Sequence, residues 1–517
     1  MRPPMPHRLV NPASFVDILV TEGQELFFSK RDAASFFDTL LAPPATRAWF
    51  CFPPVRAQAL CDALGWSLQQ LNAAISDDTG FALTSRTLVF PSSRTWPMGF
   101  AWSSAVAQDT TVGTLLSTGF PEDHIVCDTE PFPVDQRELA VVATDDVIFI
   151  HRDQEEALDR LSQYDAAMYK HGIQQATDKD VNAAGATVAL GCELTSRPAE
   201  ANPDTKKLWP LLQALVELFM SPCASPLAVH SMMGVGQWFS ILSRPHFACF
   251  GEVYEFVRRE PGNVPQQVPE KVINELLIFA GLAPLLSASL EREWCTTVVA
   301  TDAAPEYGIG VSVADLPPGD VADLGRLSER RGDYIRLNRD RSVAEPERPR
   351  VGQPTRLNLR QEDFVDVLSI RAARKEHSGI LELKGVLTGL RWILRSSRNF
   401  HKRLLFLIDA KAALSAVAKG RSGAPEWEGT MCAIMALLLA SGALMRPLYI
   451  PSEDNPADHP SRGRRRRPPI RKVKRKETFS KPDRRLHRAM REFQLRGAFV
   501  RSCSDFDTSS DGGFSLP

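Results

Sequence analysis

Two adjacent carboxylates interrupt a run of β-type residues, and this feature restricts the fold of the chain more than any other. In VVATDDVIFI (residues 141–150), Asp145 and Asp146 separate two short apolar segments. Unpaired acids are expensive to bury inside a packed strand. The pattern therefore predicts a hairpin whose tip presents both acids. A solvated turn that contains Asp-Asp by coincidence is the alternative that this segment alone leaves open.

Further acids lie where predicted strands end or predicted helices begin. Asp32 ends the apolar segment ELFFSKRD, Asp302 ends TTVVATD, and Asp409 ends RLLFLID. Glu382 lies early in the amphipathic helix ILELKGVLTGLRWILRS, and Asp458 lies at a loop or helix start in YIPSEDNPADHPSR. Taken singly, each acid also fits a turn, a helix cap or an exposed helix position.

Taken together, these acids suit the chemistry of phosphoryl transfer. That reaction needs in-line positioning and neutralisation of charge by metal ions, and Mg²⁺ prefers carboxylate oxygens. A pair of ions at one site activates the attacking oxygen and stabilises the leaving oxygen. We therefore expect two Mg²⁺ in each of two active sites, with Mn²⁺ as a substitute.

The charge of the chain is distributed unevenly. The net charge over 517 residues is −1, but residues 464–476 hold nine Lys or Arg and no acid. A basic arm of this kind suits contact with nucleic acid or nuclear import, and it also suits a solvated linker. The candidate nucleic-acid-binding residues in the arm are Arg464, Arg465, Arg466, Arg467, Lys472 and Lys474.

Cysteine usage and hydropathy limit where such a chain works. The nine cysteines form no CxxC pair, which argues against a disulfide framework and indicates a reducing compartment. The longest apolar stretch, Met431 to Met445, is too short to span a bilayer and predicts a buried helix. No signal peptide is recognisable at the start. We expect an intracellular protein of the cytoplasm, the nucleus or both, without a membrane partner.

Four segments in residues 25–194 resemble reverse transcriptases. SKRDAASFFDTL resembles motif A, WPMGFAWSSAVAQ motif B, VVATDDVIFI motif C, and HGIQQATDKDVNAAGATVALGCEL motif D with the approach to the primer grip. Their order and spacing make the resemblance specific. It implies metal binding by Asp32, Asp145 and Asp146, with Lys179 as the general acid toward pyrophosphate.

The same resemblance implies further contacts. It assigns nucleotide binding to Phe37, Met98, Gly99 and Gln108. Only 31 residues precede Asp32, so most of the family's fingers subdomain is expected to be missing. HRLVNPASF resembles its last part, with Arg8 as a template or nucleotide contact.

A second resemblance covers residues 296–463 and concerns ribonuclease H. TDAAPEYGIGV resembles the opening hairpin, LELKGVLTGLRW the glutamate helix, LFLIDAKAALSAVAKG the third acidic motif, and YIPSEDNPADHPSR the closing motif. It implies a catalytic, metal-binding set of Asp302, Glu382, Asp409 and Asp458. The closing motif is most similar to retrotransposon polyproteins of the DIRS order, with gypsy-like elements next.

The resulting expectation is an α+β and α/β protein. It consists of a fingers remnant and palm (1–200), a helical thumb or connection (201–290), a ribonuclease H-like domain with a disordered insertion at 317–362 (291–463), and a disordered tail, basic and then polar (464–517). The implied activities are RNA-directed DNA polymerase and ribonuclease H. The implied partners are RNA template, DNA primer, RNA–DNA hybrid and deoxynucleoside triphosphates. The alternative is a polymerase-inactive relic that binds nucleic acid or keeps only the nuclease.

Overall fold

The computed structural model describes residues 8–75, 82–328, 333–338 and 352–464. The chain divides into two compact units, and both contain helices and sheets, so the protein is a mixed α and β structure. The first unit comprises Met1–Pro210 and Ser287–Glu291, and the second comprises Leu211–Leu286 and Arg292–Pro517.

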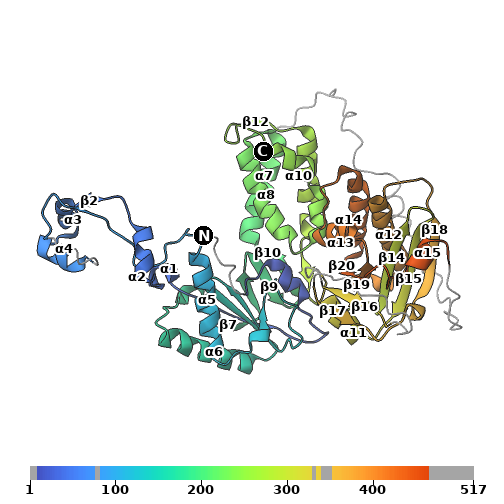
Figure 1. Ribbon diagram of the computed structural model, residues 1–517, viewed down its shortest axis with the longest axis horizontal. Coiled ribbons are helices and arrows are strands. Elements are labelled where there is room, and N and C mark those ends of the chain that lie inside the picture. Colours follow the sequence, from blue (N-terminus) through green and yellow to red (C-terminus); the bar gives the residue numbers. More distant parts are fainter. Residues whose placement is uncertain (1–7, 76–81, 329–332, 339–351, 465–517) are drawn as a thin grey trace, which may run out of the picture. The chain divides into compact units, whose positions relative to one another are not determined.

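An antiparallel-rich sheet forms the centre of the first unit (Figure 1). Its strands run in the order β4 (Ile125–Val126), β5 (Glu138–Ala143), β6 (Asp146–His151), β1 (Phe27–Asp32) and β7 (Val181–Ala184). Helices α5 (Ser103–Leu116) and α6 (Gln154–Lys170) pack on it through Leu115 and Leu161, which join Val142 and Phe149 in one apolar core. Because β5 and β6 are buried on both faces, they read as nearly continuous apolar runs.

The interrupted run of residues 141–150 forms the expected hairpin. Val142 of β5 lies opposite Val147 of β6, and the chain turns between them. Thr144 has a φ of +61°, a left-handed conformation that costs a β-branched residue energy. The turn exposes part of both acids while the apolar residues on either side stay buried.

Smaller elements complete the first unit. Between β1 and α5 lie α1 (Phe36–Thr39), α2 (Pro44–Arg47), the strand pair β2 (Val55–Arg56) and β3 (Leu88–Val89), α3 (Ala57–Leu64) and α4 (Leu68–Ala74). A second antiparallel sheet has the order β13 (Ala288–Ser289), β10 (Ala199–Pro203), β9 (Cys192–Ser196) and β8 (Ala186–Ala189).

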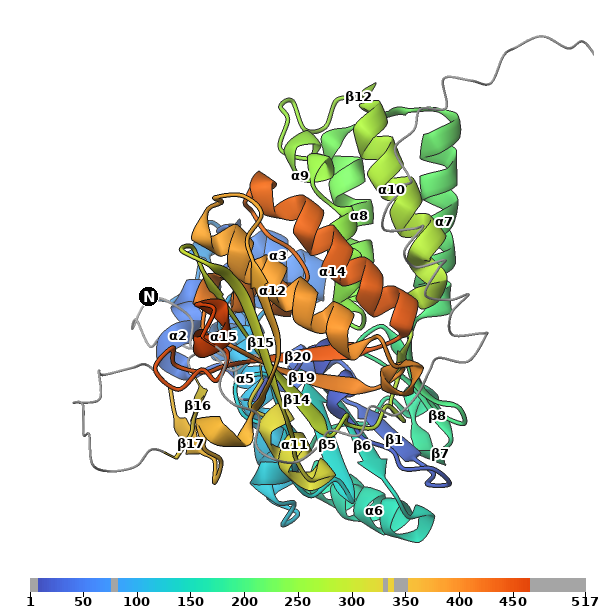
Figure 2. The ribbon, with the colours of Figure 1, turned by 90° about the vertical axis from the view of Figure 1, so that its right-hand side faces the viewer.

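A helical region, predicted from the sequence for residues 201–290, starts at the end of the first unit and forms the beginning of the second. Figure 2 shows its helices α7 (Thr205–Met220), α8 (Pro226–Ser240), α9 (Glu252–Phe256) and α10 (Glu270–Leu282). Strands β11 (Cys223–Ala224) and β12 (Gln266–Gln267) pair beside them. Gly236 of α8 lets the ring of Phe279 of α10 approach closely, since a Cβ there would lie 3.1 Å from that ring.

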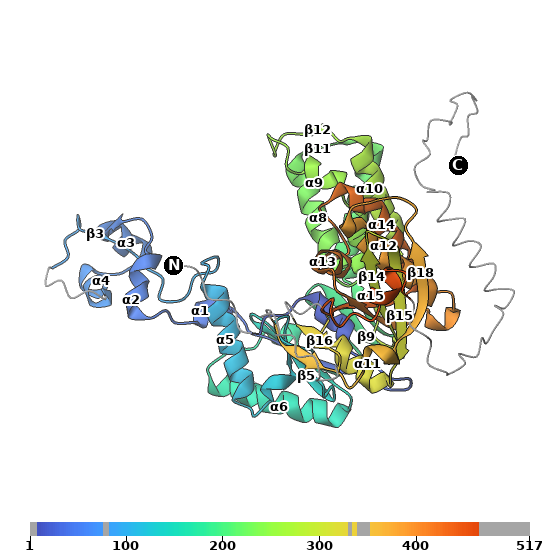
Figure 3. The ribbon, with the colours of Figure 1, turned by 45° about the vertical axis from the view of Figure 1, so that its right-hand side comes forward.

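A mixed sheet with helices on both faces forms the rest of the second unit (Figure 3). The strand order is β17 (Pro354–Arg356), β16 (Tyr334–Arg336), β20 (Leu444–Tyr449), β19 (Arg403–Ile408), β14 (Thr297–Ala304), β15 (Gly308–Asp315) and β18 (Val365–Arg371). Val299 packs with α12 (Ser378–Ile393), α13 (Lys411–Lys419) and α14 (Glu428–Ser441). Its neighbour Val298 packs with α11 (Pro318–Gly325), so these helices cover opposite faces.

The prediction of disorder for residues 317–362 was wrong for much of that segment. Helix α11 buries Val321 and Leu324 against the sheet, and β16 buries Tyr334 and Ile335. These short elements are hard to recognise in the sequence, because each supplies only a few core side chains. The rest of the segment is rich in charged residues. Residues 329–332 and 339–351 lie outside the described part of the chain.

The apolar stretch Met431–Met445 is likewise not a single helix. Helix α14 ends at Ser441, Gly442 has a φ of +62°, and β20 begins at Leu444. Glycine favours this left-handed conformation and thereby ends the helix. Within the described residues, no helix is long and apolar enough to cross a membrane. Of the tail predicted for residues 464–517, residues 465–517 lie outside the described part of the chain.

Candidate catalytic sites

Three acids of the first unit meet where β1 ends beside the hairpin. The antiparallel register places Asp32 directly opposite Asp146. Asp145 precedes β6 at the tip, and its carbonyl accepts a hydrogen bond from the N–H of Ala33 at 3.2 Å. The strand pairing therefore places Asp32 beside Asp146, more than a hundred residues away in sequence, with Asp145 at the adjoining tip.

Two lysines form ion pairs with these acids. Lys179 Nζ lies 2.9 Å from an oxygen of Asp32, as expected if Lys179 belongs to this site. Lys30, which precedes Asp32 by two positions on the same strand face, lies 3.1 Å from Asp146. The ammonium groups partly neutralise a carboxylate pair that would otherwise repel.

The electrostatics of the first site favour binding of a cation. Burial raises the pKa of Asp145, and the charge of Asp32 adds to the effect. Burial and a hydrogen bond with Asp32 raise the pKa of Asp146 to about 6. Asp146 Oδ1 is buried and has no hydrogen-bond partner among the residues that the structure describes. An unpartnered carboxylate oxygen among acids is a suitable ligand for a hard divalent ion.

Gln108, which the sequence predicts to bind nucleotide, is bonded to the protein backbone in this structure, and its nucleotide contact stays a prediction. Its side chain is fully buried on α5. Its Nε2 donates to the carbonyl of Val142 at 3.1 Å and to that of Arg8 at 3.3 Å. Its Oε1 accepts from the N–H of Thr144 at 2.7 Å. Both polar atoms of the side chain thus form hydrogen bonds with the protein backbone. Gln108 therefore supports the hairpin that carries Asp145 and Asp146.

Arg8 is also engaged inside the protein. Its side chain is buried, forms ion pairs of 3.1 Å with Glu122 and Glu130, and donates to the carbonyl of Ile125. A guanidinium in this position joins the N-terminal segment to the strand β4 region and is not presented to a template. These contacts occupy the Arg8 side chain within the protein, and nucleic-acid binding by Arg8 stays a prediction.

The other residues predicted to contact nucleotide, Phe37, Met98 and Gly99, are exposed or partly buried. Met98 is 79% exposed, and Gly99, with a φ of +92°, follows it in an exposed turn before α5. Phe37 is half-buried and packs against the apolar core of the first unit. These positions leave nucleotide binding by Phe37, Met98 and Gly99 as a prediction.

The second group of acids converges on one point of the second unit. Asp302 lies in β14, Asp409 follows the parallel strand β19, and Glu382 lies in the second turn of α12. One carboxylate oxygen from each lies within 4.8 Å of the other two. This acidic triad could hold a metal ion.

A closing segment holds the triad from one side. Asn455 donates to the carbonyl of Thr301 at 3.0 Å, and Ser461 donates to a carboxylate oxygen of Asp302. Asp409 receives hydrogen bonds from Ser452 and Asn455, which lower its pKa against the effect of burial. The segment 452–461 therefore positions two of the three acids.

Burial and mutual repulsion disfavour the ionised forms of the three triad carboxylates when no cation is bound. Burial raises the pKa of Glu382 to about 9 and that of Asp302 to about 7, and the charge of Asp409 adds to both shifts. Burial also raises the pKa of Asp409. Asp409 Oδ1 is buried and has no hydrogen-bond partner. Three clustered carboxylates with an unpartnered oxygen fit a divalent ion such as Mg²⁺.

Asp458, the fourth predicted ligand, is not gathered with the triad. It begins α15 (Asp458–Ser461), and its Oδ1 accepts from Arg462 Nε at 2.9 Å. Its charge still raises the pKa of Asp302. Arg464 is exposed, and the other predicted residues of the basic arm, Arg465, Arg466, Arg467, Lys472 and Lys474, lie outside the described residues.

Sequence reasoning missed several residues that support the two sites. Lys30 pairs with Asp146, and Thr111 donates from α5 to the carbonyl of Thr144 at 2.6 Å. Asn455 and Ser461 belong to the closing motif, in which the sequence predicts a catalytic role for Asp458 alone. The position of Lys30 two residues before Asp32 was the available signal, because alternate residues of a strand share a face.

Comparisons with known proteins give a distant likeness. No protein-family model and no curated protein matches the chain. The chain is similar, at 11% identity, to solved structures of foamy viral protease-reverse transcriptase. The complex with double-stranded DNA matches 87% of this chain and 72% of that chain with a TM-score of 0.39.

Two further structures of foamy viral protease-reverse transcriptase match this chain to a similar extent. The complex with an RNA/DNA hybrid matches 86% of this chain and 67% of that chain with a TM-score of 0.36. The form named dRH, in complex with double-stranded DNA, has a TM-score of 0.38, and the match covers 86% of this chain. The chain spans 60% of the length of that protein.

Proposed function

We propose that the chain is a retroelement RNA-directed DNA polymerase with ribonuclease H activity. Its first site would extend a DNA primer on an RNA template from deoxynucleoside triphosphates. Its second site would cut the RNA strand of the resulting RNA–DNA hybrid. A retrotransposon of the DIRS or gypsy-like kind is the source that the sequence motifs favour.

The observation that carries this proposal is the presence of two separate acidic sites on two sheets. In the first, Asp32 lies opposite Asp146 across a strand pair. In the second, Asp302, Glu382 and Asp409 bring oxygens within 4.8 Å. Both sites hold a buried carboxylate oxygen without a partner. One metal-dependent chemistry at two places is what a polymerase and its hybrid nuclease require.

In the nuclease, the chain's own residues have distinct roles. Asp302, Glu382 and Asp409 would hold the ions, and Asn455 and Ser461 keep the two aspartates in place. Bound Mg²⁺ would supply charge neutralisation and an activated water. Glu382 must lose its proton when ions bind, because its pKa of about 9 keeps it protonated near neutral pH.

In the polymerase, Asp32, Asp145 and Asp146 would hold Mg²⁺, and Lys179 would protonate the leaving pyrophosphate. The ion pair of Lys179 with Asp32 raises the pKa of the lysine, so it keeps its proton until that contact changes. Lys30 would release Asp146 as the ions bind. Phe37 is proposed to exclude ribonucleotides through their 2′-hydroxyl.

Two single substitutions test the proposal by separating its activities. Asp145→Asn should abolish primer extension on poly(rA)–oligo(dT) with Mg²⁺ or Mn²⁺ while hybrid cleavage persists. Asp409→Asn should abolish cleavage of a labelled hybrid while extension persists. Equal loss of both activities from either change, in a protein that stays folded, would contradict two independent sites.

A nuclease without polymerase activity is the second candidate function. Two observations favour it: the three nuclease carboxylates already converge, whereas Asp32 and Asp146 each form an ion pair with a lysine. Hybrid cleavage that depends on Asp409, with no primer extension by the unmodified protein, would establish this candidate over the first.

A further inference from the structure

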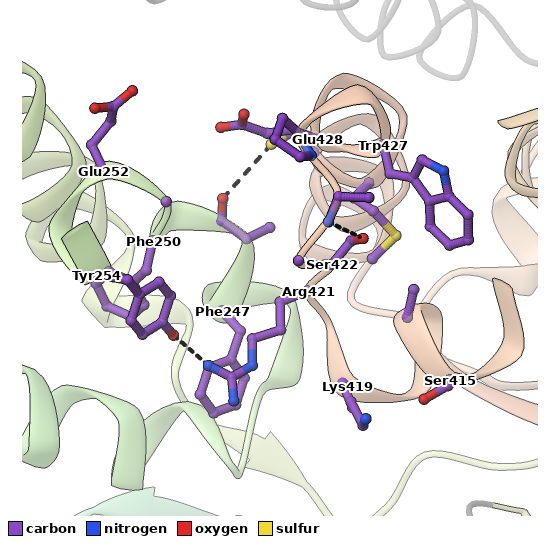
Figure 4. A pocket seen from close by; sticks show the side chains of 18 of the residues that line it. Phe247, Phe250, Glu252, Tyr254, Ser415, Lys419, Arg421, Ser422, Trp427 and Glu428 are labelled. Carbon is purple, nitrogen blue, oxygen red and sulfur yellow. Dashed lines mark hydrogen bonds between the residues drawn. The ribbon is translucent and has the colours of Figure 1, made fainter. Parts of the chain in front are cut away.

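A cavity of about 760 Å³ lies within the second unit (Figure 4), and none of the three triad acids lines it. The 3-10 helix Arg244–Cys249 and α9 form one wall. The face of α13, the loop 420–427 and the start of α14 form the other wall. A cavity of this size accommodates a small organic ligand or one to two nucleotides.

Aromatic side chains from both walls line the cavity. Phe247 and Tyr254 lie on one side and Trp427 on the other. The Arg421 guanidinium lies 5.5 Å from the ring centre of Phe247 and 5.4 Å from that of Tyr254, and it donates to the Tyr254 hydroxyl at 2.7 Å. Trp427 packs against Gly379 of α12, so its ring is held in place. Flat ligands would find fixed rings and a guanidinium plane on which to stack.

The cavity is lined by Glu255 and Arg258 and by charged residues that Figure 4 labels at two opposite ends. Lys419, Arg421 and Ser415 lie together at one end, and Glu252 and Glu428 lie at the other (Figure 4). Within the described residues, Lys419 has no ion pair, whereas Glu252 pairs with Lys271 at 3.3 Å. The basic end suits a phosphate, and the acidic end suits N–H donors rather than a second phosphate.

We propose that this cavity binds one or two unpaired nucleotides of single-stranded RNA, with phosphate at Lys419 and Arg421 and base against the aromatic rings. The assignment of RNA rests on the proposed nuclease function. Helix α13 begins two residues after Asp409 and ends at Lys419. Its nine residues span about 13 Å, so the cavity lies one short helix from the nuclease acids. It is placed to hold the unpaired end of the strand that the nuclease cuts.

The test measures binding without catalysis. A fluorescently labelled hexaribonucleotide is titrated with the full chain in EDTA, and its anisotropy is followed. Lys419→Ala and Arg421→Ala should each weaken binding about tenfold, the usual effect of losing one charge-assisted hydrogen bond. Lys206→Ala, which removes an exposed lysine of α7 outside the cavity, should leave binding unchanged. Trp427→Phe should weaken it less than either, and thermal unfolding checks that each variant folds.

Two outcomes would overturn the proposal. One is affinity unchanged in Lys419→Ala and Arg421→Ala. The other is an equal loss for the hexamer and for a duplex of the same sequence, which would indicate a general basic surface. A competing nucleoside monophosphate should displace the hexamer, whereas inorganic phosphate alone should do so only at far higher concentration.

The nuclease proposal can fail separately. Asp409→Asn should lose hybrid cleavage and keep hexamer binding. If the unmodified protein cuts no hybrid but its hexamer binding still depends on Lys419 and Arg421, the cavity remains a single-strand site and only the nuclease function is lost.

Discussion

The side-chain oxygen of Gln108 accepts a hydrogen bond from the backbone N–H of Thr144 at 2.7 Å, which fastens α5 to the tip of the hairpin that carries Asp145 and Asp146. Thr111, one helical turn further on, donates to the carbonyl of the same threonine at 2.6 Å. Thr144 has a left-handed backbone, which costs roughly 1–3 kcal/mol for a non-glycine residue. The helix therefore holds the turn in a conformation that it would not adopt alone.

Gln108→Leu should weaken both the fold and the proposed polymerase. The backbone groups of Val142 and Thr144 would lose buried partners, and each loss typically costs about 1–3 kcal/mol. We expect a lower free energy of unfolding in urea. In primer extension we expect a lower kcat with little change in the KM for nucleotide, because the residue positions the acids and does not touch the substrate.

Thr110→Ala is the matched control, since Thr110 lies on the same helix and its hydroxyl bonds only to the carbonyl of Val106 there. It should change stability and kcat little. A raised nucleotide KM with unchanged kcat in Gln108→Leu would restore the interpretation of Gln108 as a nucleotide contact.

The sequence predicted the parts of the sites that depend on backbone pattern. Acids at the ends of apolar runs, such as Asp32 and Asp409, indicated strand ends, and the interrupted run at Asp145 indicated a hairpin. Asp302, also expected at a strand end, lies instead inside β14, which continues to Ala304. Strand pairing then brings such ends together, because apolar burial fixes the register. The hairpin and the convergence of Asp302, Glu382 and Asp409 follow from this logic.

The sequence did not predict which polar side chains serve the protein itself. Gln108 and Arg8 lie in segments that resemble substrate-binding motifs, yet the polar groups of both side chains bond to other residues of the protein. Burial of a polar side chain depends on neighbours more than a hundred residues away in sequence, here Glu122 and Ile125 for Arg8. Local spacing carries no information about such partners.

The pKa of Glu382 predicts a pH-dependent stability difference in the absence of metal. The ordinary pKa is 4.5 and the folded value is about 9, so the folded state favours the protonated form. This contribution is fully present below pH 4.5 and is lost as the pH rises toward 9. In EDTA, the Tm of Glu382→Gln minus that of the unmodified protein should therefore increase from pH 5 to pH 9.

Added Mg²⁺ provides the control for that experiment. Metal ions bind the deprotonated carboxylates, so Mg²⁺ at pH 8 should raise the Tm of the unmodified protein and close the gap to Glu382→Gln. A Tm difference that stays constant from pH 5 to pH 9 would contradict a raised pKa at this position.

Gly310→Ala should strongly reduce hybrid cleavage. Gly310 of β15 pairs with Asp302, and a Cβ at Gly310 would lie 2.4 Å from the carbonyl of Ala457 and from the nitrogen of Ser461. Backbone cannot yield to such contacts without moving the closing segment, which holds the triad. We expect at least a tenfold loss of cleavage and a lower Tm, with primer extension retained, because the polymerase acids lie in the other unit.

Gly319→Ala is the control, since no atom lies within 4 Å of the Cβ position there. It should leave cleavage and Tm nearly unchanged. Cleavage by Gly310→Ala at the level of Gly319→Ala would mean that the closing segment does not need its present position.

Arg336→Met should destabilise the second unit, because Arg336 joins β16 to the closing segment. Its guanidinium lies 3.1 Å from Asp454 and 3.0 Å from Glu453, and Asp454 is 1% exposed. Removing one partner of a buried pair typically costs about 3–5 kcal/mol, since a charge stays buried without compensation. The free energy of unfolding, measured in urea, should fall by that order, and hybrid cleavage should fall with it.

The double variant Arg336→Met/Asp454→Asn should recover part of this loss, since no charge is then left buried opposite the methionine. Arg374→Met, at an exposed position before α12, should cost little. A loss below about 1 kcal/mol in Arg336→Met would mean that β16 contributes no more than a surface ion pair.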